Sequence, residues 1–155
     1  MSQRDIDSYY MQQALMCARE SEKQGEVPVG AVLLVNQQLV ARAYNQTLAC
    51  RDPTAHAEIL VLRQAANVFN NHRLLDATLY VTLEPCLMCV GAMIQARIKR
   101  LVFAAYDKRC GALGSVFNSL YSQGINHRFL VTEGLLAHES MEILKQFFLQ
   151  RRNKT

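Results

Sequence analysis

The stretch that decides the fold is residues 77–105, ATLYVTLEPCLMCVGAMIQARIKRLVFAA. Alternating apolar residues predict a strand over Ala77–Leu83, and a second strand is predicted over Arg100–Ala105. Cys86–Ala96, between them, is predicted to be helical. Because parallel strands need a crossover connection, which is usually a helix, this stretch predicts a strand–helix–strand unit of an α/β sheet.

Six further elements are predicted around this unit. Amphipathic spacing predicts the helices and short apolar runs predict the strands, with a turn at Asn36-Gln37-Gln38 closing an opening hairpin. Helices alternating with strands indicate a partly parallel sheet with helices on both faces, the α/β class. Helices are expected over Ile6–Lys23 (capped by Asp5 or Asp7), Pro53–Asn67 (capped by Asp52) and Leu136–Arg152, and strands over Val29–Val35, Leu39–Tyr44 and Phe129–Thr132.

The length and composition favour one globular domain over residues 1–155. Of the 155 residues, 50% are hydrophobic and 19% are charged, which excludes the polar, highly charged composition of a disordered chain. The chain shows no repeat, no low-complexity tract and no linker.

The amino terminus lacks the basic and apolar segments of a secretory signal, and no stretch is apolar for long enough to span a bilayer. We therefore expect a cytoplasmic protein with no membrane partner. The chain has five cysteines, an odd number. Without an export signal, reduced thiols or metal ligands are favoured over a disulfide framework.

Basic charge is concentrated in the last third of the chain. The formal net charge is only +4, but residues 97–155 contain ten Lys or Arg and four acidic residues. Residues 1–96 are slightly acidic. This asymmetry favours a nucleic-acid partner for the carboxy-terminal part.

Two short motifs carry the chemistry, His56-Ala57-Glu58 and Pro85-Cys86-Leu87-Met88-Cys89. Cys86 and Cys89 are three residues apart, so their sulfurs fall on the same side of the first turn of a helix. Zinc suits thiolate and imidazole ligands, and one His with two Cys leaves the fourth tetrahedral position open for water. The motifs therefore predict a catalytic rather than a structural zinc site.

Glu58 is predicted to move protons without binding the metal. Residues two apart lie about 200° apart around a helix, so His56 and Glu58 can serve one site only at a helix end, where side chains reach past the last turn. Zinc lowers the pKa of a bound water to about 7, and a nearby carboxylate can accept the proton that this water loses.

Each motif alone has an ordinary explanation. Cys-x-x-Cys also occurs as two buried cysteines or as a redox pair, and His-x-Glu is common by chance. Together, with Pro85 following Glu58 by 27 residues, they match the His-x-Glu…Pro-Cys-x-x-Cys signature of zinc deaminases. A structural zinc would need a fourth ligand nearby, and Cys50 and Cys110 lie outside both motifs.

Longer segments make the chain resemble the bacterial tRNA-specific adenosine deaminases over nearly its whole length. The zinc motif alone specifies only the broader cytidine-deaminase-like superfamily, whereas the later segments narrow the resemblance to the tRNA enzymes. The matching segments are Glu26–Ala31, Asp52–Glu58, Leu83–Cys89, Tyr106-Asp107, Gly111-Ala112, Gly114-Ser115, Asn126–Arg128 and Thr132–Gly134.

This resemblance implies a three-layer α/β/α sandwich around a mixed five-stranded sheet, and a homodimer with the active site close to the subunit interface. It also implies hydrolytic conversion of the wobble adenosine of a tRNA anticodon, chiefly in an arginine tRNA, to inosine with release of ammonia. His56, Cys86 and Cys89 would hold one zinc ion per subunit. Glu58 would transfer protons between the attacking water and the base.

The resemblance further assigns contacts to the anticodon loop. Asn45 would hydrogen-bond the flipped base and the Val27-Pro28-Val29 stretch would pack against it, whereas a turn asparagine and strand core are the ordinary alternatives. Asp107 would meet a ribose, the alternative being a solvated acid or a helix cap.

The carboxy-terminal helix offers two kinds of candidate for RNA contact. Arg151 and Arg152 are expected to touch phosphates. Phe147 and Phe148 have the spacing of a helix core and are weaker candidates for base stacking.

Two other functions remain open from the sequence. A deaminase of a free base or nucleoside (guanine, cytosine or cytidine) would share the zinc chemistry but would not require the basic carboxy-terminal third. A non-catalytic RNA-binding scaffold with a structural zinc would have no use for Glu58 beside an open coordination position.

Overall fold

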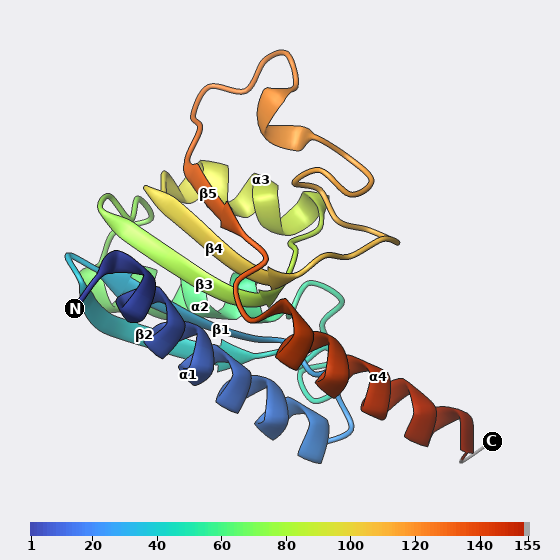
Figure 1. Ribbon diagram of the computed structural model, residues 1–155. Coiled ribbons are helices and arrows are strands. Elements are labelled where there is room, and N and C mark those ends of the chain that lie inside the picture. Colours follow the sequence, from blue (N-terminus) through green and yellow to red (C-terminus); the bar gives the residue numbers. More distant parts are fainter. Residues whose placement is uncertain (154–155) are drawn as a thin grey trace.

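A mixed five-stranded sheet lies between two layers of helices, as predicted (Figure 1). The structure is a computed structural model that describes residues 1–153. The strand order is β2-β1-β3-β4-β5; β1 is antiparallel to β2 and β3, whereas β3, β4 and β5 are parallel. The strands are β1 (Gly30–Val35), β2 (Gln38–Tyr44), β3 (Ala77–Leu83), β4 (Arg100–Ala105) and β5 (Leu130–Glu133).

The opening hairpin turns on two residues, Asn36 and Gln37. Both have positive φ, 49° and 66°, the conformation of a type I′ turn, whose twist matches that of the flanking strands. Gln38, expected in the turn, is the first residue of β2. The β4–β5 connection contains only a 3-10 turn, η1 (Ser119–Tyr121), and no α-helix.

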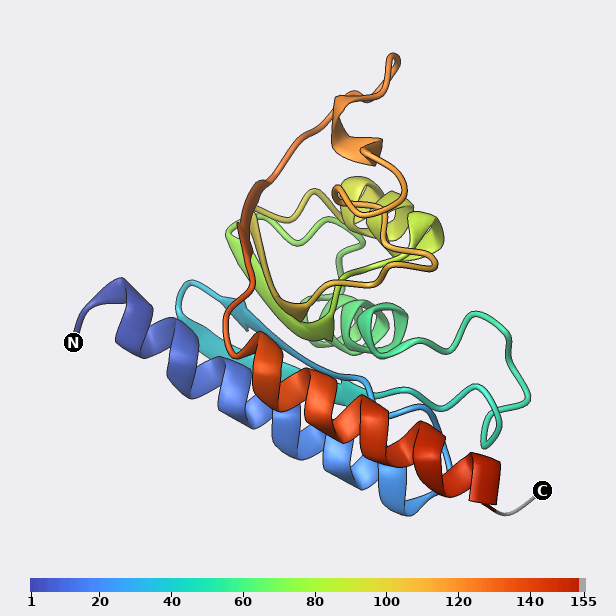
Figure 2. The same ribbon diagram turned by 45° about the vertical axis from the view of Figure 1, so that its right-hand side comes forward.

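Two helices cover each face of the sheet. In Figures 1 and 2, α1 (Gln3–Lys23) and α4 (Ala137–Asn153) lie side by side on one face, and α2 (Ala57–Phe69) and α3 (Leu87–Ala96) lie on the other. Alternate residues of β1, β3 and β4 enter two separate cores. Tyr80 and Val102 pack towards α1, whereas Leu79 and Phe103 pack towards α2 and α3. No helix among residues 1–153 is both long and apolar enough to cross a membrane.

The first helix begins earlier than predicted. Ser2 caps α1, because its hydroxyl accepts a hydrogen bond from the Asp5 backbone and the Asp5 carboxylate accepts one from the Ser2 backbone. This reciprocal pair is a capping box. Asp5 is therefore the third helical residue and not the cap, and Asp7 has a different role.

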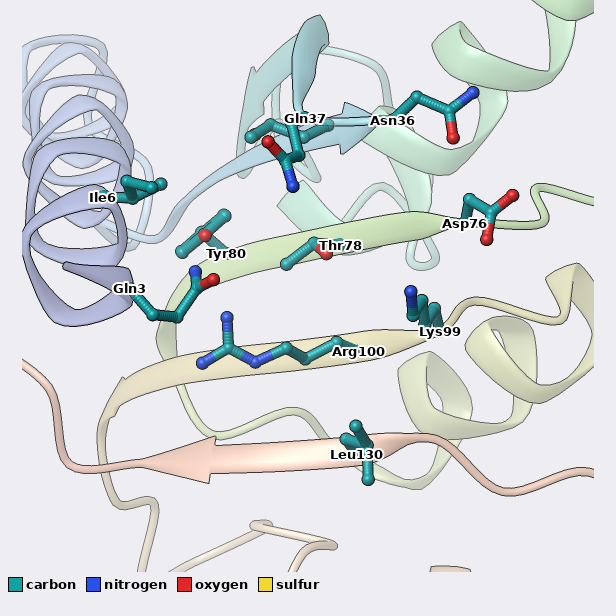
Figure 3. A pocket seen from close by; sticks show the side chains of 11 residues that line it. Gln3, Ile6, Asn36, Gln37, Asp76, Thr78, Tyr80, Lys99, Arg100 and Leu130 are labelled. Atoms are coloured by element: carbon teal, nitrogen blue, oxygen red, sulfur yellow. The ribbon is translucent and has the colours of Figure 1, made fainter. Parts of the chain in front are cut away.

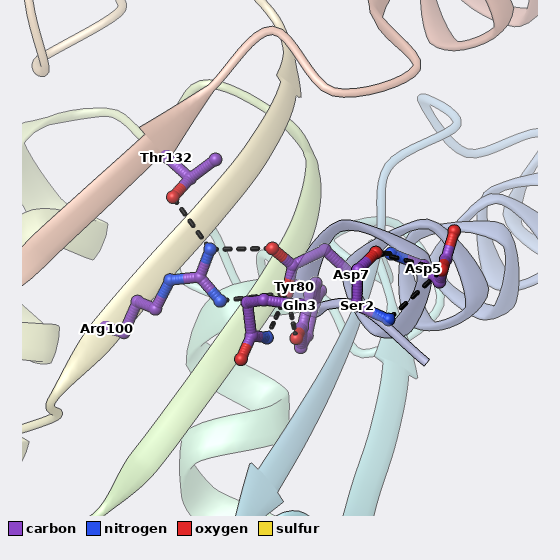
Figure 4. A network of polar contacts seen from close by, with 7 residues as sticks. All are labelled: Ser2, Gln3, Asp5, Asp7, Tyr80, Arg100 and Thr132. Carbon is purple, nitrogen blue, oxygen red and sulfur yellow. Dashed lines mark hydrogen bonds and ion pairs between the residues drawn. The ribbon is translucent and has the colours of Figure 1, made fainter.

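Asp7 ties α1 to the sheet. Its buried carboxylate accepts hydrogen bonds from both terminal nitrogens of Arg100 on β4, at 2.8 and 2.7 Å, and from the Tyr80 hydroxyl at 2.7 Å (Figure 4). Arg100 also donates to Thr132 of β5. The network thus joins one helix to three adjacent strands.

The start of α2 also differs from the prediction. Asp52 does not cap a helix at Pro53; its Oδ1 accepts hydrogen bonds from the backbone and hydroxyl of Thr54, at 2.8 and 2.7 Å, and forms a local turn. The chain stays extended at His56, which is the N-cap, and the helix starts at Ala57. This shift places His56 at the very end of the helix.

Candidate metal centre and active site

The amino ends of α2 and α3 converge on one group of three side chains. His56 and Cys86 are the N-caps of these helices, both with extended backbone and neither with a side-chain capping bond, and Cys89 lies in the first turn of α3. Their ligand atoms all lie within 4.8 Å of one another. The predicted ligands are therefore brought together.

The distances within this group fit a tetrahedral ion. His56 Nδ1 lies 3.7 Å from Cys86 Sγ and 3.5 Å from Cys89 Sγ. Zinc–nitrogen and zinc–sulfur bonds of ordinary length at a tetrahedral angle separate the two ligand atoms by about 3.6 Å. The spacing and the donor types match zinc, and three ligands leave one coordination position open.

The two thiols are electrostatically unequal. Hydrogen bonding from Cys89, aided by His56, lowers the pKa of the Cys86 thiol to about 4. The same interaction with Cys86, together with burial, raises the pKa of Cys89. Hydrogen bonding to Cys86 raises the pKa of His56. A bound cation favours the thiolate form of a ligand and draws both sulfurs to it.

Glu58 lies beside this group on the first turn of α2. Its residue is only 4% exposed, and burial raises the pKa of its carboxyl group. Glu58 nevertheless lines a cavity of about 440 Å³ together with His56 and Cys86. A carboxyl group therefore lies next to the side chains that could hold a metal ion.

Most of the residues expected to hold a base line the same cavity. Val27, Val29, Asn45 and Asp107 are among its walls, whereas Pro28 is buried and does not line it. The Asp107 Oδ1 atom accepts hydrogen bonds from the backbone of Arg109 and Cys110 at 2.9 and 3.2 Å. Asp107 therefore closes a local turn as well as facing the cavity.

Arg151 and Arg152 lie outside this cavity. They line a separate depression with Arg109 and Phe148. Arg151 donates a hydrogen bond of 2.6 Å to the Gly25 carbonyl and stacks over the Phe147 ring. Phe147 is a core residue at 4% exposure, whereas Phe148 is 42% exposed, so the two rings have different surroundings.

The structure adds residues that the sequence patterns did not single out. Glu84 is a buried carboxylate that lines the cavity, as do Thr47, Leu83 and Cys110, and Glu26 is a buried carboxylate next to Val27 of the cavity wall. Both glutamates fall inside segments that carry the family resemblance. Glu26 directly precedes Val27, and Glu84 directly follows Leu83. A charged residue next to apolar neighbours was the signal in the sequence that could have identified these two buried carboxylates.

A second cavity, of about 250 Å³, lies at the opposite end of the sheet (Figure 3). Lys99 and Arg100 of the β4 end, Tyr80, and the hairpin residues Asn36 and Gln37 line it. Arg100 is already paired with Asp7. The metal-binding group of the described residues lies in the first cavity only.

The class of protein follows from a family comparison. Residues 6–152 match the family of MafB19-like deaminases, so this chain is a deaminase. Within that class it belongs to the tRNA-specific adenosine deaminases, as its relatives demonstrate. The enzyme of that name from Haemophilus influenzae is 46% identical over 97% of this chain and 87% of its own length, and that from Bacillus subtilis is 42% identical over 96% and 92%.

Solved structures agree with this assignment. A structure from a study of A-to-I editing by tRNA:A34 deaminases at the wobble position superimposes with a TM-score of 0.86 at 43% identity, covering 88% of this chain and 99% of that one. A guanine deaminase from Nitrosomonas europaea has a TM-score of 0.76 at 26% identity, covering 90% and 83%.

Proposed function

We propose that this protein deaminates the wobble adenosine of a tRNA anticodon to inosine, with an arginine tRNA as its main substrate. The observation that carries the proposal is the convergence of His56, Cys86 and Cys89 beside Glu58 in a cavity of a chain whose relatives are tRNA-specific deaminases. Water replaces the 6-amino group of adenine, and the nitrogen leaves as ammonia.

His56, Cys86 and Cys89 would hold one zinc ion in each chain. When bound, zinc supplies a water whose pKa is lowered to about 7 and which is therefore a nucleophile near neutral pH. The spacing of the three ligand atoms supports this assignment.

Glu58 carries the protons of the reaction. Its carboxylate accepts a proton from the attacking water and delivers it to the adenine ring nitrogen N1, then assists departure of the amino group. Burial supports this role, because the raised pKa of Glu58 brings the carboxyl group closer to the neutral range in which it can both accept and donate.

Residues on the cavity wall would bind the flipped nucleotide. Asn45 would hydrogen-bond the base and Val27 would pack against it, and both residues line the cavity, whereas Pro28 does not. Asp107, which also lines the cavity, would meet a ribose hydroxyl, and such a contact distinguishes RNA from DNA. The cavity volume lies in the range of small-molecule and nucleotide sites.

Basic residues next to the cavity would hold the anticodon backbone. Arg109 lies in the chain between Asp107 and Cys110, both of which line the cavity, so the depression that Arg109 forms with Arg151 and Arg152 adjoins the cavity rim. Guanidinium groups bind phosphate oxygens, and the half-exposed Phe148 ring beside them can stack on a base.

We further propose that the protein is a cytoplasmic homodimer. tRNA as substrate implies the cytoplasm as the compartment. An apolar depression on the outer face of α2 and α3, lined in part by Ile59, Leu62 and Ala92, is the surface that a second copy would cover.

The test is a deamination assay of the zinc-loaded protein on unmodified arginine tRNA with adenosine at the wobble position. Free adenosine, cytidine and guanine are assayed in parallel, and sequencing locates the inosine. Inosine confined to the wobble position is the expected result. Turnover of guanine with the tRNA unchanged would favour the second candidate, a free-base deaminase, which the likeness to guanine deaminase makes a specific alternative.

A further inference from the structure

Two buried carboxylates beside the cavity take no part in the chemistry described above. Glu26 is 1% exposed and Glu84 is 2% exposed. Removing a carboxylate from water is costly unless it is fully hydrogen-bonded, and within residues 1–153 neither one belongs to a salt bridge or to the metal-binding group. Their hydrogen-bond donors come instead from two loops that contribute Thr47, Asp107 and Cys110 to the cavity wall.

Glu84 binds the segment 107–115 at four points. Its Oε1 accepts hydrogen bonds from the Asp107 backbone at 3.1 Å and from the Ser115 hydroxyl, and its Oε2 accepts bonds from the backbones of Leu113 and Ser115 at 3.0 and 3.2 Å. This segment contains no helix. Glu84 therefore replaces the regular backbone pairing that the segment lacks.

Close packing reinforces this arrangement at Gly111. A Cβ atom there would overlap the Glu84 carboxyl group and the Asp107 carbonyl oxygen. Only glycine lets the backbone approach the carboxylate so closely. The segment is thus fitted around Glu84.

Glu26 binds the loop of residues 47–49 in the same way. Its Oε1 accepts hydrogen bonds from the Leu48 backbone at 3.1 Å and the Thr47 hydroxyl at 3.4 Å, and its Oε2 accepts one from the Ala49 backbone at 2.8 Å. This loop directly follows Asn45. Thr47 itself lines the cavity.

We propose that Glu26 and Glu84 are positioning residues, each of which holds one loop of the cavity wall in its substrate-binding shape before the substrate arrives. This inference rests on the proposed function for the identity of the substrate. Loops ordered in advance do not lose that conformational entropy on binding, so the benefit falls on substrate affinity and on the Michaelis constant.

Glutamine substitution tests each carboxylate separately. In Glu84→Gln, one carboxylate oxygen becomes an N–H donor and can no longer accept a backbone hydrogen bond. Depending on the orientation of the amide, either the bond from the Asp107 backbone or those from the Leu113 and Ser115 backbones are lost, whereas the Ser115 hydroxyl can turn to accept from the amide. Backbone hydrogen exchange, followed by NMR on the zinc-loaded full chain, should accelerate about tenfold or more at Asp107, Leu113 or Ser115. Leu48 and Ala49 should keep their protection.

Glu26→Gln is the matched control and should give the reverse pattern. Exchange should accelerate at Leu48 or Ala49, depending on the orientation of the amide, and stay unchanged in 107–115. Glu142→Gln removes an exposed acid on α4 and should change neither loop. Unchanged protection of both loops in their respective variants would overturn the proposal.

Steady-state kinetics on the wobble-adenosine tRNA separate positioning from simple loss of folded protein. For Glu84→Gln, KM should rise about tenfold while kcat changes less than about threefold. A purely structural role would reduce the active fraction, and therefore kcat, at constant KM. That result would also overturn the proposal.

If Glu84→Gln does not fold, Ser115→Ala tests the role of Glu84 instead. The Ser115 side chain is exposed, and its loss removes a single donor to Glu84, so a smaller rise in KM of about threefold is expected, with unchanged stability. An unchanged KM would refute the role of Glu84. If the wild-type protein fails to deaminate tRNA at all, the proposed function fails, and the exchange measurements alone then decide whether the two carboxylates hold the loops.

Discussion

The Glu58 carboxyl group is buried in the first turn of α2 and still borders the cavity that His56 and Cys86 line. Burial disfavours its charged form, and the residue is not needed to complete the ligand set. The catalytic role proposed for Glu58 would account for a buried carboxyl group at this position.

Substituting Glu58 by Gln should remove proton transfer and keep the metal. We expect kcat for wobble deamination to fall about 10²- to 10⁴-fold, with about one zinc per chain retained. Rate assays and metal analysis on the same sample measure both. A variant with full activity would contradict the assigned role.

Cys86 should be necessary for metal binding. In Cys86→Ala, zinc content should fall well below one ion per chain and deamination should fall with it, because two protein ligands hold the ion far less tightly than three. Cys50→Ala is the control, since Cys50 is an exposed thiol outside the metal-binding group. Unchanged zinc content in Cys86→Ala would disprove the ligand assignment.

Among the elements, α1 and β1 approach each other very closely at Gly30. A Cβ atom at this position would overlap the α1 backbone at Ala14 and Ala18. The helix therefore packs directly on the strand, and Asp7 fixes its other end through Arg100.

Gly30→Ala should lower the free energy of unfolding by about 3 kcal/mol, because either α1 or β1 must move to accept the methyl group. Gly91→Ala is the matched control: nothing lies within 4 Å of its Cβ position in α3. Alanine favours a helix interior over glycine by about 1 kcal/mol, so this variant should be neutral or more stable. Urea denaturation measures both, and equal effects would contradict the packing argument.

The Asp7 network predicts how α1 docking depends on pH. Burial opposes ionisation of Asp7, but hydrogen bonds from Arg100, Tyr80 and Gln3 outweigh it and hold the pKa of the carboxyl group below its usual value. A carboxyl group with a lowered folded-state pKa stabilises the protein above its unfolded pKa of about 4. This stabilisation disappears as the pH falls through the folded-state pKa.

Asp7→Asn should therefore cost about 3 kcal/mol at pH 7, since Arg100 loses the charge that balances it. The difference from the wild type should shrink as the pH is lowered from about 5 to about 3. Denaturant titrations at several pH values provide the measurement. A difference that does not vary with pH would show that Asp7 acts through shape alone.

At the scale of the whole molecule, three of the ten basic residues of the last third lie together at the end of α4. Arg109, Arg151 and Arg152 line one depression although Arg109 lies far from the other two in the sequence. The tertiary structure therefore brings basic residues that are separated in the sequence into one surface depression.

The double substitution Arg151→Ala with Arg152→Ala should weaken tRNA binding. It should also reduce the magnitude of the slope of log affinity against log salt concentration by about one to two, because binding releases fewer counterions when phosphate contacts are lost. Arg4→Ala with Arg73→Ala removes the same charge from exposed residues elsewhere. Equilibrium binding at several salt concentrations compares the pairs. An equal loss in both would indicate a general effect of net charge.

The sequence by itself was sufficient to predict the fold class and most of the elements. The strands β3 and β4 lie as predicted because apolar patterning and burial act locally along the chain. The convergence of His56, Cys86 and Cys89 was predictable because a zinc site restricts both the residue types and their spacing. That these residues hold zinc and that Glu58 moves protons stay predictions.

Only the tertiary structure determined which hydrogen-bond partners, distant in the sequence, the buried carboxylates have. Asp7 could be taken for a helix cap until Arg100, 93 residues away, was placed against it. Asp52-Pro53 has the composition of a helix start, but the Asp52 carboxylate accepts its hydrogen bonds from Thr54 and does not cap a helix. The helix starts instead at Ala57, and its N-cap, His56, lies beside the cysteines. The loops bound by Glu26 and Glu84 show no hydrophobic periodicity in the sequence that would predict their shape. Their backbone N–H groups donate instead to carboxylates that are buried elsewhere in the fold.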